Sequence, residues 1–378
     1  MPLDLPITTY SDTTPQRQVI TDVIAMIDPS DAPAVEAIGG LDGAASRFSF
    51  TAVGTKMEWL EDTLPPLTSN LAMAASVGTG ATAVTLTATD ASLLQPGHLL
   101  LFTTGEIVYV SDVAISTNII TVTRAFNSVN GSLVSTEIAF EIVGMARMEA
   151  DESDPLAATD RTSNHNYTDI LHQEVRVSGT LGVIPQYGIP DEEEYQSSRV
   201  LPNLMRILDK QLYYGVRAQG SATTPRSMGG FSTFITDNLY EGSSLTKAKF
   251  EALAQMMYTD GGSGDWIALL SPGNVAKVQA FYENTGYLWI ERGETTVGMP
   301  PAKKVLTAFG EVTLVMDRWA PSTKIYMLDR QHVGMKTLRP FAVEPLAKTG
   351  DYDKKQVIGE FSLCVRLDKA HGILTAVS

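Results

Sequence analysis

The side chains that could do chemistry are few and scattered in this chain of 378 residues. A metal site, or a nucleophile paired with a histidine, would have to be assembled wholly by the fold, because the five histidines lie far apart: His98, His165, His172, His332 and His371. The single cysteine, Cys364, lies in the apolar alternating stretch Glu360 to Leu367. This setting predicts a buried strand thiol and not a nucleophile, and one cysteine excludes a disulfide within the chain.

Local motifs for catalysis or cofactor binding are also missing. The sequence has no G-x-x-x-x-G-K-[ST] loop, no G-x-S-x-G elbow, and no H-E-x-x-H or C-x-x-C motif. Gly78 and Gly80 precede a predicted strand, where a dinucleotide site requires a helix. Asp351 and Asp353 begin like a calcium loop, but Gln356 stands where that loop needs glycine. We therefore predict no catalytic residue, no cofactor and no metal, and expect that the chain is not an enzyme.

The formal net charge of −15 argues against a protein that grips nucleic acid. Such binding draws its free energy from Lys and Arg that neutralise phosphates. Acidic runs at 149–154 and 191–194 could hold a cation, but a solvated loop and a helix start explain them more simply.

The first ten residues lack the basic start and apolar core of a secretory signal, and no stretch approaches the roughly 20 apolar residues of a membrane span. We expect a soluble chain that is made in a reducing cytoplasm. Because the sequence begins at Met1, we also expect that no N-terminal segment has been cleaved from it.

The N-terminal region predicts an arm. Residues 1–14 show no period, and Pro15 and Asp28-Pro29 bracket a segment whose apolar residues repeat at helical spacing: Val19, Ile20, Val23, Ile24 and Ile27. Helices shorter than about 12–15 residues are marginal in water, so this one needs a surface on which to dock. That surface belongs either to a neighbouring subunit or to the arm's own body, and the sequence leaves both alternatives open.

Two extended stretches, 47–64 and 168–178, flank a region of different composition. From 68 to 144 the chain is rich in Thr, Val, Ala and Ile, with short apolar runs separated by turns such as Thr104-Gly105 and Asn130-Gly131. This pattern predicts a small all-β module inserted between the extended stretches. We expect these two stretches to pair as one long hairpin, and the polar residues up to Asn166 to form a loop.

The carboxyl half predicts a mixed α+β body. A helix begins at the acidic run after Pro190, and one apolar face continues to Gly215 through Leu201, Leu204, Leu208 and Leu212. Pro202 is expected to kink this helix or to divide it near Leu201. Further on, helices are predicted around Phe250–Met257 and Val275–Tyr282. Strands are predicted at 266–270, 311–316, 325–328, 333–338 and 360–367.

Three segments carry a resemblance to a known family: Ile20 to Gly39 (ITDVIAMIDPSDAPAVEAIG), Glu58 to Leu64 (EWLEDTL) and Arg339 to Gly372 (RPFAVEPLAKTGDYDKKQVIGEFSLCVRLDKAHG). Together they resemble major capsid proteins of tailed double-stranded DNA bacteriophages with the Hong Kong phage capsid fold, in the branch of the SU-ten head protein. The resemblance implies an α+β chain with an N-terminal arm (1–46), an extended loop (47–67 and 145–187), an inserted β domain (68–144), a peripheral domain with a long spine helix (188–230 and 320–378) and an axial domain (231–319).

The same resemblance implies hexamers and pentamers of this chain in an icosahedral shell that encloses DNA without recognising it specifically, in a virion assembled in the host cytoplasm. The implied partners are copies of the chain, a portal protein, and decoration proteins on the inserted domain. We predict assembly contacts at Val19, Ile20, Val23, Ile24 and Trp59, with packing inside the same subunit as the alternative at each position. The rival functions are a nanocompartment shell of the same fold, a tail or adhesion virion protein, and a hydrolase with a dispersed site.

Overall fold

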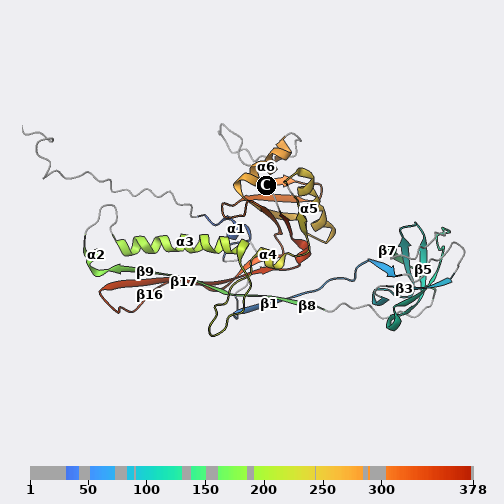
Figure 1. Ribbon diagram of the computed structural model, residues 1–378, viewed down its shortest axis with the longest axis horizontal. Helices are drawn as coiled ribbons and strands as arrows, with labels where there is room; N and C mark the ends of the chain where they lie inside the picture. Colours follow the sequence, from blue (N-terminus) through green and yellow to red (C-terminus); the bar gives the residue numbers. More distant parts are fainter. Residues whose placement is uncertain are drawn as a thin grey trace, which may run out of the picture. The chain divides into compact units, whose positions relative to one another are not determined.

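The computed structural model describes residues 31–41, 52–72, 83–88, 91–129, 138–149, 161–184, 191–242, 244–283, 288–289 and 304–375. The chain divides into two compact units. Unit 1 comprises Met1–Trp59 and Asn164–Ser378, and unit 2 comprises Leu60–Ser163. Each unit has its own core and is described by itself (Figure 1). No helix among the described residues is long and apolar enough to span a membrane.

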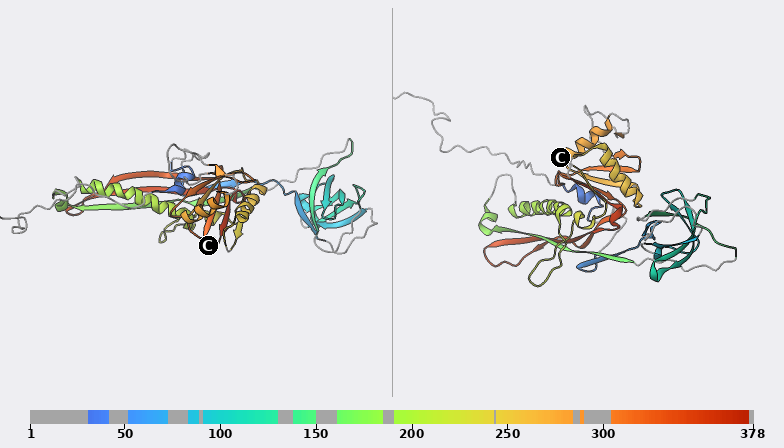
Figure 2. Two further views of the ribbon diagram at one scale, coloured as in Figure 1. Left: turned by 90° about the horizontal axis from the view of Figure 1, so that it is seen from above. Right: turned by 45° about the vertical axis from the view of Figure 1, so that its right-hand side comes forward.

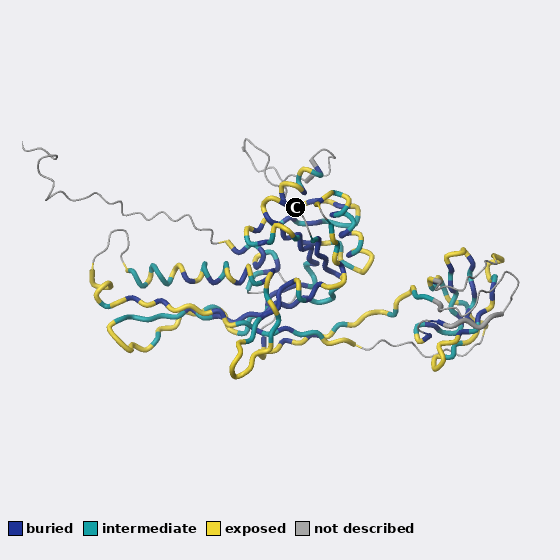
Figure 3. Tube along the Cα trace, in the orientation of Figure 1, coloured by how far each residue is buried: buried dark blue, intermediate teal, exposed yellow. Residues whose placement is uncertain are grey.

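Unit 1 contains a seven-stranded mixed sheet in the order β10-β18-β15-β11-β14-β13-β12. Its strands are β10 (Leu239–Glu241), β11 (Asp265–Leu270), β12 (Leu288–Trp289), β13 (Lys304–Leu306), β14 (Glu311–Met316), β15 (Lys324–Asp329) and β18 (Gly372–Thr375). The central strand β11 is buried on both faces, because its five consecutive residues from Trp266 to Leu270 are all buried. Figure 3 shows buried residues gathered in the body of unit 1. Successive side chains of a strand point to opposite faces, so Trp266 and Ala268 enter one core and Ile267 and Leu269 another.

Helices α5 (Lys247–Thr259) and α6 (Pro272–Glu283) belong to the core that contains Trp266. The apolar face predicted for α5 is confirmed, since Phe250 and Met257 are both fully buried. The Thr246 side chain caps α5 by accepting a hydrogen bond from the Lys249 N–H. The helix ends before Gly261, whose φ of 98° lies in the left-handed region that glycine adopts at little cost.

A second sheet of unit 1 is fully antiparallel, in the order β16-β17-β9. It consists of β9 (Asp169–Ser178), β16 (Val333–Pro345) and β17 (Tyr352–Val365). Helix α3 (Glu192–Tyr214) packs on β9 and β17, and lies alongside them in every view (Figure 2). Cys364 on β17 is buried, as predicted. The described residues of unit 1 also form three short α-helices, α1 (Pro33–Ala37), α2 (Gly179–Val183) and α4 (Phe231–Phe234), and a 3-10 turn at Asp368–Ala370.

Helix α3 differs from its prediction at two residues. It runs without a break through Pro202, so the expected division near Leu201 is wrong. Proline removes one backbone hydrogen bond, but α3 buries Val200 before Pro202 and Leu204, Leu208 and Leu212 after it, and this packing on both sides holds the helix together. Leu201 is 43% exposed, and Val200 takes its expected place on the buried face.

Unit 2 is built on a closed barrel of six antiparallel strands in the order β2-β3-β6-β5-β4-β7. These are β2 (Thr68–Ala72), β3 (Ala83–Ala88), β4 (His98–Phe102), β5 (Ile107–Ala114), β6 (Ile119–Thr123) and β7 (Ile138–Met145), with 3-10 turns at Ala91–Leu93 and Ile115–Thr117. Leu100, Val108 and Ile120 are fully buried in its interior. Closure removes the free strand edges that an open sheet would expose.

The predicted hairpin between the two extended stretches is wrong. β1 (Lys56–Glu61) pairs with β8 (Thr162–Tyr167), a polar segment predicted to be a loop, while β9 pairs with β17. The long register from Tyr352↔Ser178 to Phe361↔Asp169 explains the choice. It buries alternate apolar residues of β9 such as Val175 and Val177, which pairing with the mostly exposed β1 would not do.

The last strands of the chain divide between the two sheets of unit 1. Within 320–378, β15 and β18 are hydrogen-bonded into the seven-stranded sheet with β10 and β11, whereas β16 and β17 pair in the antiparallel sheet. The domain boundaries that the resemblance implies stay a prediction. The chain crosses between the two sheets of unit 1 after β15 and again after β17. Strand composition does not reveal which sheet an apolar strand joins, because both sheets bury Val, Ile and Leu.

Candidate assembly surfaces

Of the five predicted assembly contacts, four lie outside the described residues: Val19, Ile20, Val23 and Ile24. The fifth, Trp59, is only 7% exposed and belongs to the core of unit 1. Its ring lies 5.6 Å, centroid to centroid, from that of Phe234 in α4. The structure therefore shows Trp59 packed within its own chain, and its role as an assembly contact stays a prediction.

Residues 31–41 form an anchor at which the N-terminal segment is fixed to unit 1. Small apolar residues suit the close packing of α1, and Ala34, Val35 and Ile38 are almost completely buried. The Trp319 indole N–H donates to the Asp31 carbonyl oxygen (3.0 Å), and the Thr337 hydroxyl donates to the Leu41 carbonyl oxygen (2.7 Å). These side chains follow β14 and lie in β16, so both sheets of unit 1 hold the anchor.

A pair of buried carboxyl groups lies beneath this anchor. Asp209 on α3 and Asp317, which follows β14, are each fully buried. The Val35 N–H donates to Asp209 Oδ1 (2.9 Å), the Tyr213 hydroxyl donates to Asp317 Oδ2 (2.5 Å) and the Trp319 N–H donates to Asp317 Oδ1 (2.8 Å). Burial, reinforced by the neighbouring Asp317 carboxyl, raises the pKa of Asp209 from 3.8 to about 8. Sequence reasoning missed this pair, although a carboxylate between Leu208 and Leu212 on a buried helix face was a signal.

A second polar cluster joins β17 to the segment before α4. Glu360 is 3% exposed and accepts hydrogen bonds from Thr168 (2.6 Å), Arg339 (3.1 Å) and Arg226. Burial alone would raise the pKa of Glu360, but the hydrogen bonds from Thr168 and Arg226 and the charge of Arg226 hold it below its ordinary value. Asn166 adds a buried bridge by donating to the carbonyl oxygens of Gly229 (3.2 Å) and Leu363 (2.8 Å). These bonds fix the ends of β8 and β9 to the body.

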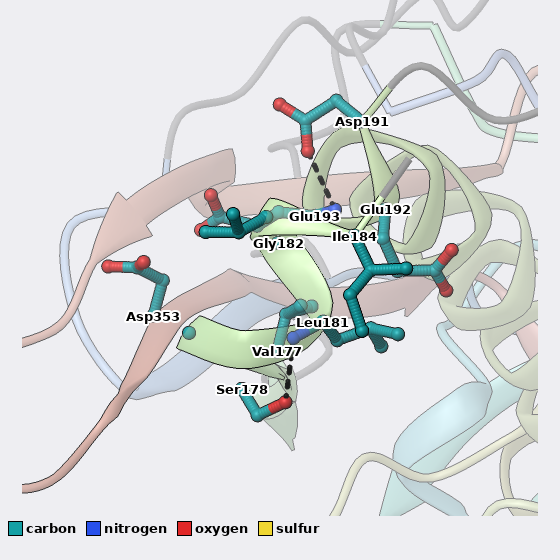
Figure 4. A pocket seen from close by; sticks show the side chains of 11 residues that line it. Val177, Ser178, Leu181, Gly182, Ile184, Asp191, Glu192, Glu193 and Asp353 are labelled. Atoms are coloured by element: carbon teal, nitrogen blue, oxygen red, sulfur yellow. Dashed lines mark hydrogen bonds between the residues drawn. The ribbon is translucent and has the colours of Figure 1, made fainter. Parts of the chain in front are cut away.

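The end of unit 1 at which α3 begins carries an open cavity of about 330 Å³ (Figure 4). Asp191 caps α3 by accepting hydrogen bonds from the N–H groups of Glu193 (2.8 Å) and Glu194 (3.3 Å), which places carboxylates at the positive end of the helix dipole. Opposite them, α2 exposes Val183 (83%) and the adjoining Ile184 (54%). We call this surface, formed by α2, Ile184 and residues 191–193, the tip.

Unit 2 presents its own exposed apolar side chains on the loop after β6. Phe126 and Val129 are 54% and 45% exposed. The loop is braced from below by a fully buried ion pair, in which Arg124 Nε donates to Glu106 Oε1 (2.9 Å), and by the Ala125 N–H, which donates to the same oxygen (3.1 Å). Ala125 has a φ of 56°, a strained conformation for a residue with a side chain. The fold thus holds Phe126 outward on a rigid support.

Comparison with known proteins decides the family of the chain. The model of the SU10 major capsid protein family matches residues 7–378. The chain belongs to this family. Its role is therefore that of a capsid protein, a subunit of a viral shell, and the resemblance carried by the three quoted segments is confirmed. Among curated proteins, none matches the chain.

Solved phage capsids share the fold of this capsid protein at low identity. The capsid of an empty GTA particle is 8% identical and matches 100% of both chains with a TM-score of 0.53. The cyanophage A-1(L) capsid is 10% identical and matches 98% of this chain and 99% of that one, also with a TM-score of 0.53. The protein of Microbacterium phage Oxtober96 is 12% identical and matches 99% of each chain with a TM-score of 0.51. The α+β capsid fold is thus confirmed.

The comparisons do not support the alternative function of a nanocompartment shell. The SrpI encapsulin of Synechococcus elongatus PCC 7942 is 15% identical and matches 58% of this chain and 78% of its own, but its TM-score is 0.43, too low to carry an argument. The described residues hold no group of three or more His, Cys, Asp or Glu side chains arranged to bind a metal ion.

Proposed function

We propose that this capsid protein assembles into hexamers and pentamers that close into an icosahedral head shell around double-stranded DNA, and that it acts without catalysis. The observation that carries the proposal is the family match over nearly the whole chain. Physical features of the chain support it. Many copies that each make weak contacts through projecting segments form a stable shell by multivalency, without a larger core in each subunit.

The tip is the surface of unit 1 that we assign to contacts between subunits. Val183 and Ile184 expose apolar area that the described part of the chain leaves uncovered, beside a rim of carboxylates. A neighbouring copy that covers these side chains gains about 25 cal/mol for each Å² of apolar surface buried. The carboxylates favour a basic segment in the covering surface, because opposite charges steer and orient association.

The Val183→Asp variant tests this contact. A charge at a position that is 83% exposed leaves the fold of one subunit intact, but would be buried without a partner in the shell. We expect sedimentation of the purified variant to show unassembled protein at concentrations at which the parent chain forms particles. Val183→Thr, which keeps the size without the charge, should still assemble. Normal assembly of the Asp variant would remove the tip from the interface and leave the family role intact.

The net negative charge of the chain is compatible with a shell that encloses DNA. A net charge of −15 gives a shell that encloses a polyanion without gripping it. The binding of short duplex DNA to empty shells tests this property: we expect weak binding with little dependence on salt concentration. Strong binding that falls steeply with salt would indicate a basic lining and contradict the proposal.

We extend the proposal to the finer partners and location: a portal protein in the shell, decoration proteins on unit 2, and assembly in the host cytoplasm. Unit 2 has twelve carboxylates and three arginines between Leu60 and Ser163, and one of these arginines is the buried Arg124. Such a surface favours a basic decoration protein that covers Phe126. Virions that carry Phe126→Ser should lack one protein present in the parent virion, and an unchanged protein composition would contradict this assignment.

A further inference from the structure

The anchor at residues 31–41 rests on an ionisable side chain that it also covers. Val35 in α1 donates its N–H to Asp209, and the Ala34 N–H interacts with the same carboxyl group. α1 packs directly on α3, where Asp209 is fully buried. Removal of α1 would therefore take away both the hydrogen bonds to this carboxyl group and part of its cover.

The surroundings of the buried carboxyl pair favour the protonated form of Asp209 while the anchor is docked. Asp209 Oδ2 is buried and has no hydrogen-bond donor among the described residues, and the Asp209 carboxyl interacts with that of Asp317. Two carboxylates in contact away from water repel each other strongly. A proton on Asp209 removes the repulsion and supplies the missing hydrogen bond. The oxygens of Asp317 already accept hydrogen bonds from Tyr213 and Trp319.

The other ionisable groups around the pair do not replace this proton. Burial keeps the hydroxyls of Tyr213 and Tyr326 protonated by raising their pKa. The nearby cations are engaged at the outer side of the anchor, where Arg206 and Lys210 lie over the Trp319 ring and Arg318 lies 3.5 Å from an Asp31 oxygen.

We propose that docking of residues 31–41 onto α3 takes up one proton into the Asp209–Asp317 pair, so that the anchor is a latch that loosens as pH rises. In the open state Asp209 meets water and ionises as an ordinary carboxyl, whereas in the docked state it keeps its proton. By linkage, the ratio of open to docked anchor then increases about tenfold for each pH unit between the two pKa values. This equilibrium lies within one chain and goes beyond the role in the shell, so it can be tested whether or not particles form.

Hydrogen exchange of the Val35 amide measures the opening directly. The unassembled full-length chain is compared at pH 5.5, 6.5 and 7.5, with rates corrected for the intrinsic pH dependence of exchange. We expect the opening equilibrium to rise about tenfold at each step in the parent chain. In Asp209→Asn it should be independent of pH, because the amide keeps the shape, accepts the Val35 N–H and donates to Asp317, but cannot ionise.

Asp260→Asn is the matched control, since this exposed carboxylate follows α5 in unit 1 and should leave the parent slope unchanged. A pH-independent opening in the parent chain overturns the proposal without reference to any variant. A slope in Asp209→Asn equal to that of the parent also overturns it. If Asp209→Asn fails to fold, Asp317→Asn serves instead, because without its anionic neighbour Asp209 ionises at lower pH and the slope between pH 6.5 and 7.5 should diminish.

Discussion

Each unit of this capsid protein buries a pair of ionisable side chains, and the two pairs have opposite electrostatics. In unit 2, Arg124 and Glu106 carry opposite charges, form two parallel hydrogen bonds and brace the loop that presents Phe126. In unit 1, Asp209 and Asp317 carry the same kind of group, and burial together with the neighbouring Asp317 carboxyl raises the pKa of Asp209. The first arrangement is a fixed support, whereas the second makes the attachment of a chain segment depend on pH. We therefore expect the barrel to keep one conformation and the anchor to exchange between a docked and an open state.

The largest effect is expected from Glu106→Gln, which removes the negative charge opposite the buried Arg124 guanidinium. Removing one member of a buried ion pair costs about 3–5 kcal/mol, so the barrel should lose most of its protection against hydrogen exchange in β5 and β6. All four tryptophans lie outside unit 2, so the unfolding of unit 1 can be followed separately by their fluorescence and should not change. Asp112→Asn, at an exposed carboxylate of β5, is the control. Equal effects of the two variants would show that the ion pair does not support the barrel.

An intermediate effect is expected from pH, with opposite signs for two buried groups of unit 1. His371 is fully buried, and burial lowers its pKa to about 4, so its contribution to stability is complete above its ordinary value of 6.5 and is lost as pH falls toward 4. The Asp209 contribution is complete below 3.8 and is lost as pH rises toward 8. Between pH 6.5 and 8 only Asp209 acts, so the urea midpoint of unit 1, followed by tryptophan fluorescence, should fall over this range. In Asp209→Asn the midpoint should stay level there, and a parallel decline in parent and variant would contradict the assignment.

The smallest effect is expected from the exposed ion pair at the same anchor. Arg318 and Asp31 are 3.5 Å apart with side chains 60% and 44% exposed. Such pairs contribute about 0.2–1 kcal/mol, so Arg318→Gln should shift the urea midpoint only slightly and not at all in 1 M salt. A large loss of stability would mean that the surface contact, and not the buried carboxyl pair, holds the anchor.

The parts of this fold that sequence could predict are those set by local periodicity. The buried face of α5 and the strands β6 and β14 follow directly from apolar spacing and turn residues. The pairing of β1 with β8 could not be predicted, since the polar residues of β8 show no alternation and its partner is about a hundred positions away. Pro202 was given too much weight, because a local rule about helices ignores the packing on both sides of it.

The candidate surfaces were less accessible to sequence reasoning. Trp59 was predicted to be an assembly contact, with packing inside the same subunit as the alternative, and in this structure its ring packs against Phe234 from a distant segment. Asp209 and Asp317 are separated by more than a hundred residues, and neither alone signals a shared proton. Only the fold brings α1, α3 and the segment after β14 to one point.

Electron microscopy of the purified full-length chain, imaged over a range of salt concentrations, shows whether this protein assembles into shells. We expect closed shells of regular size, built from repeated copies of this one subunit. A monodisperse monomer under every salt condition, with deletion of residues 1–30 changing nothing, would contradict it.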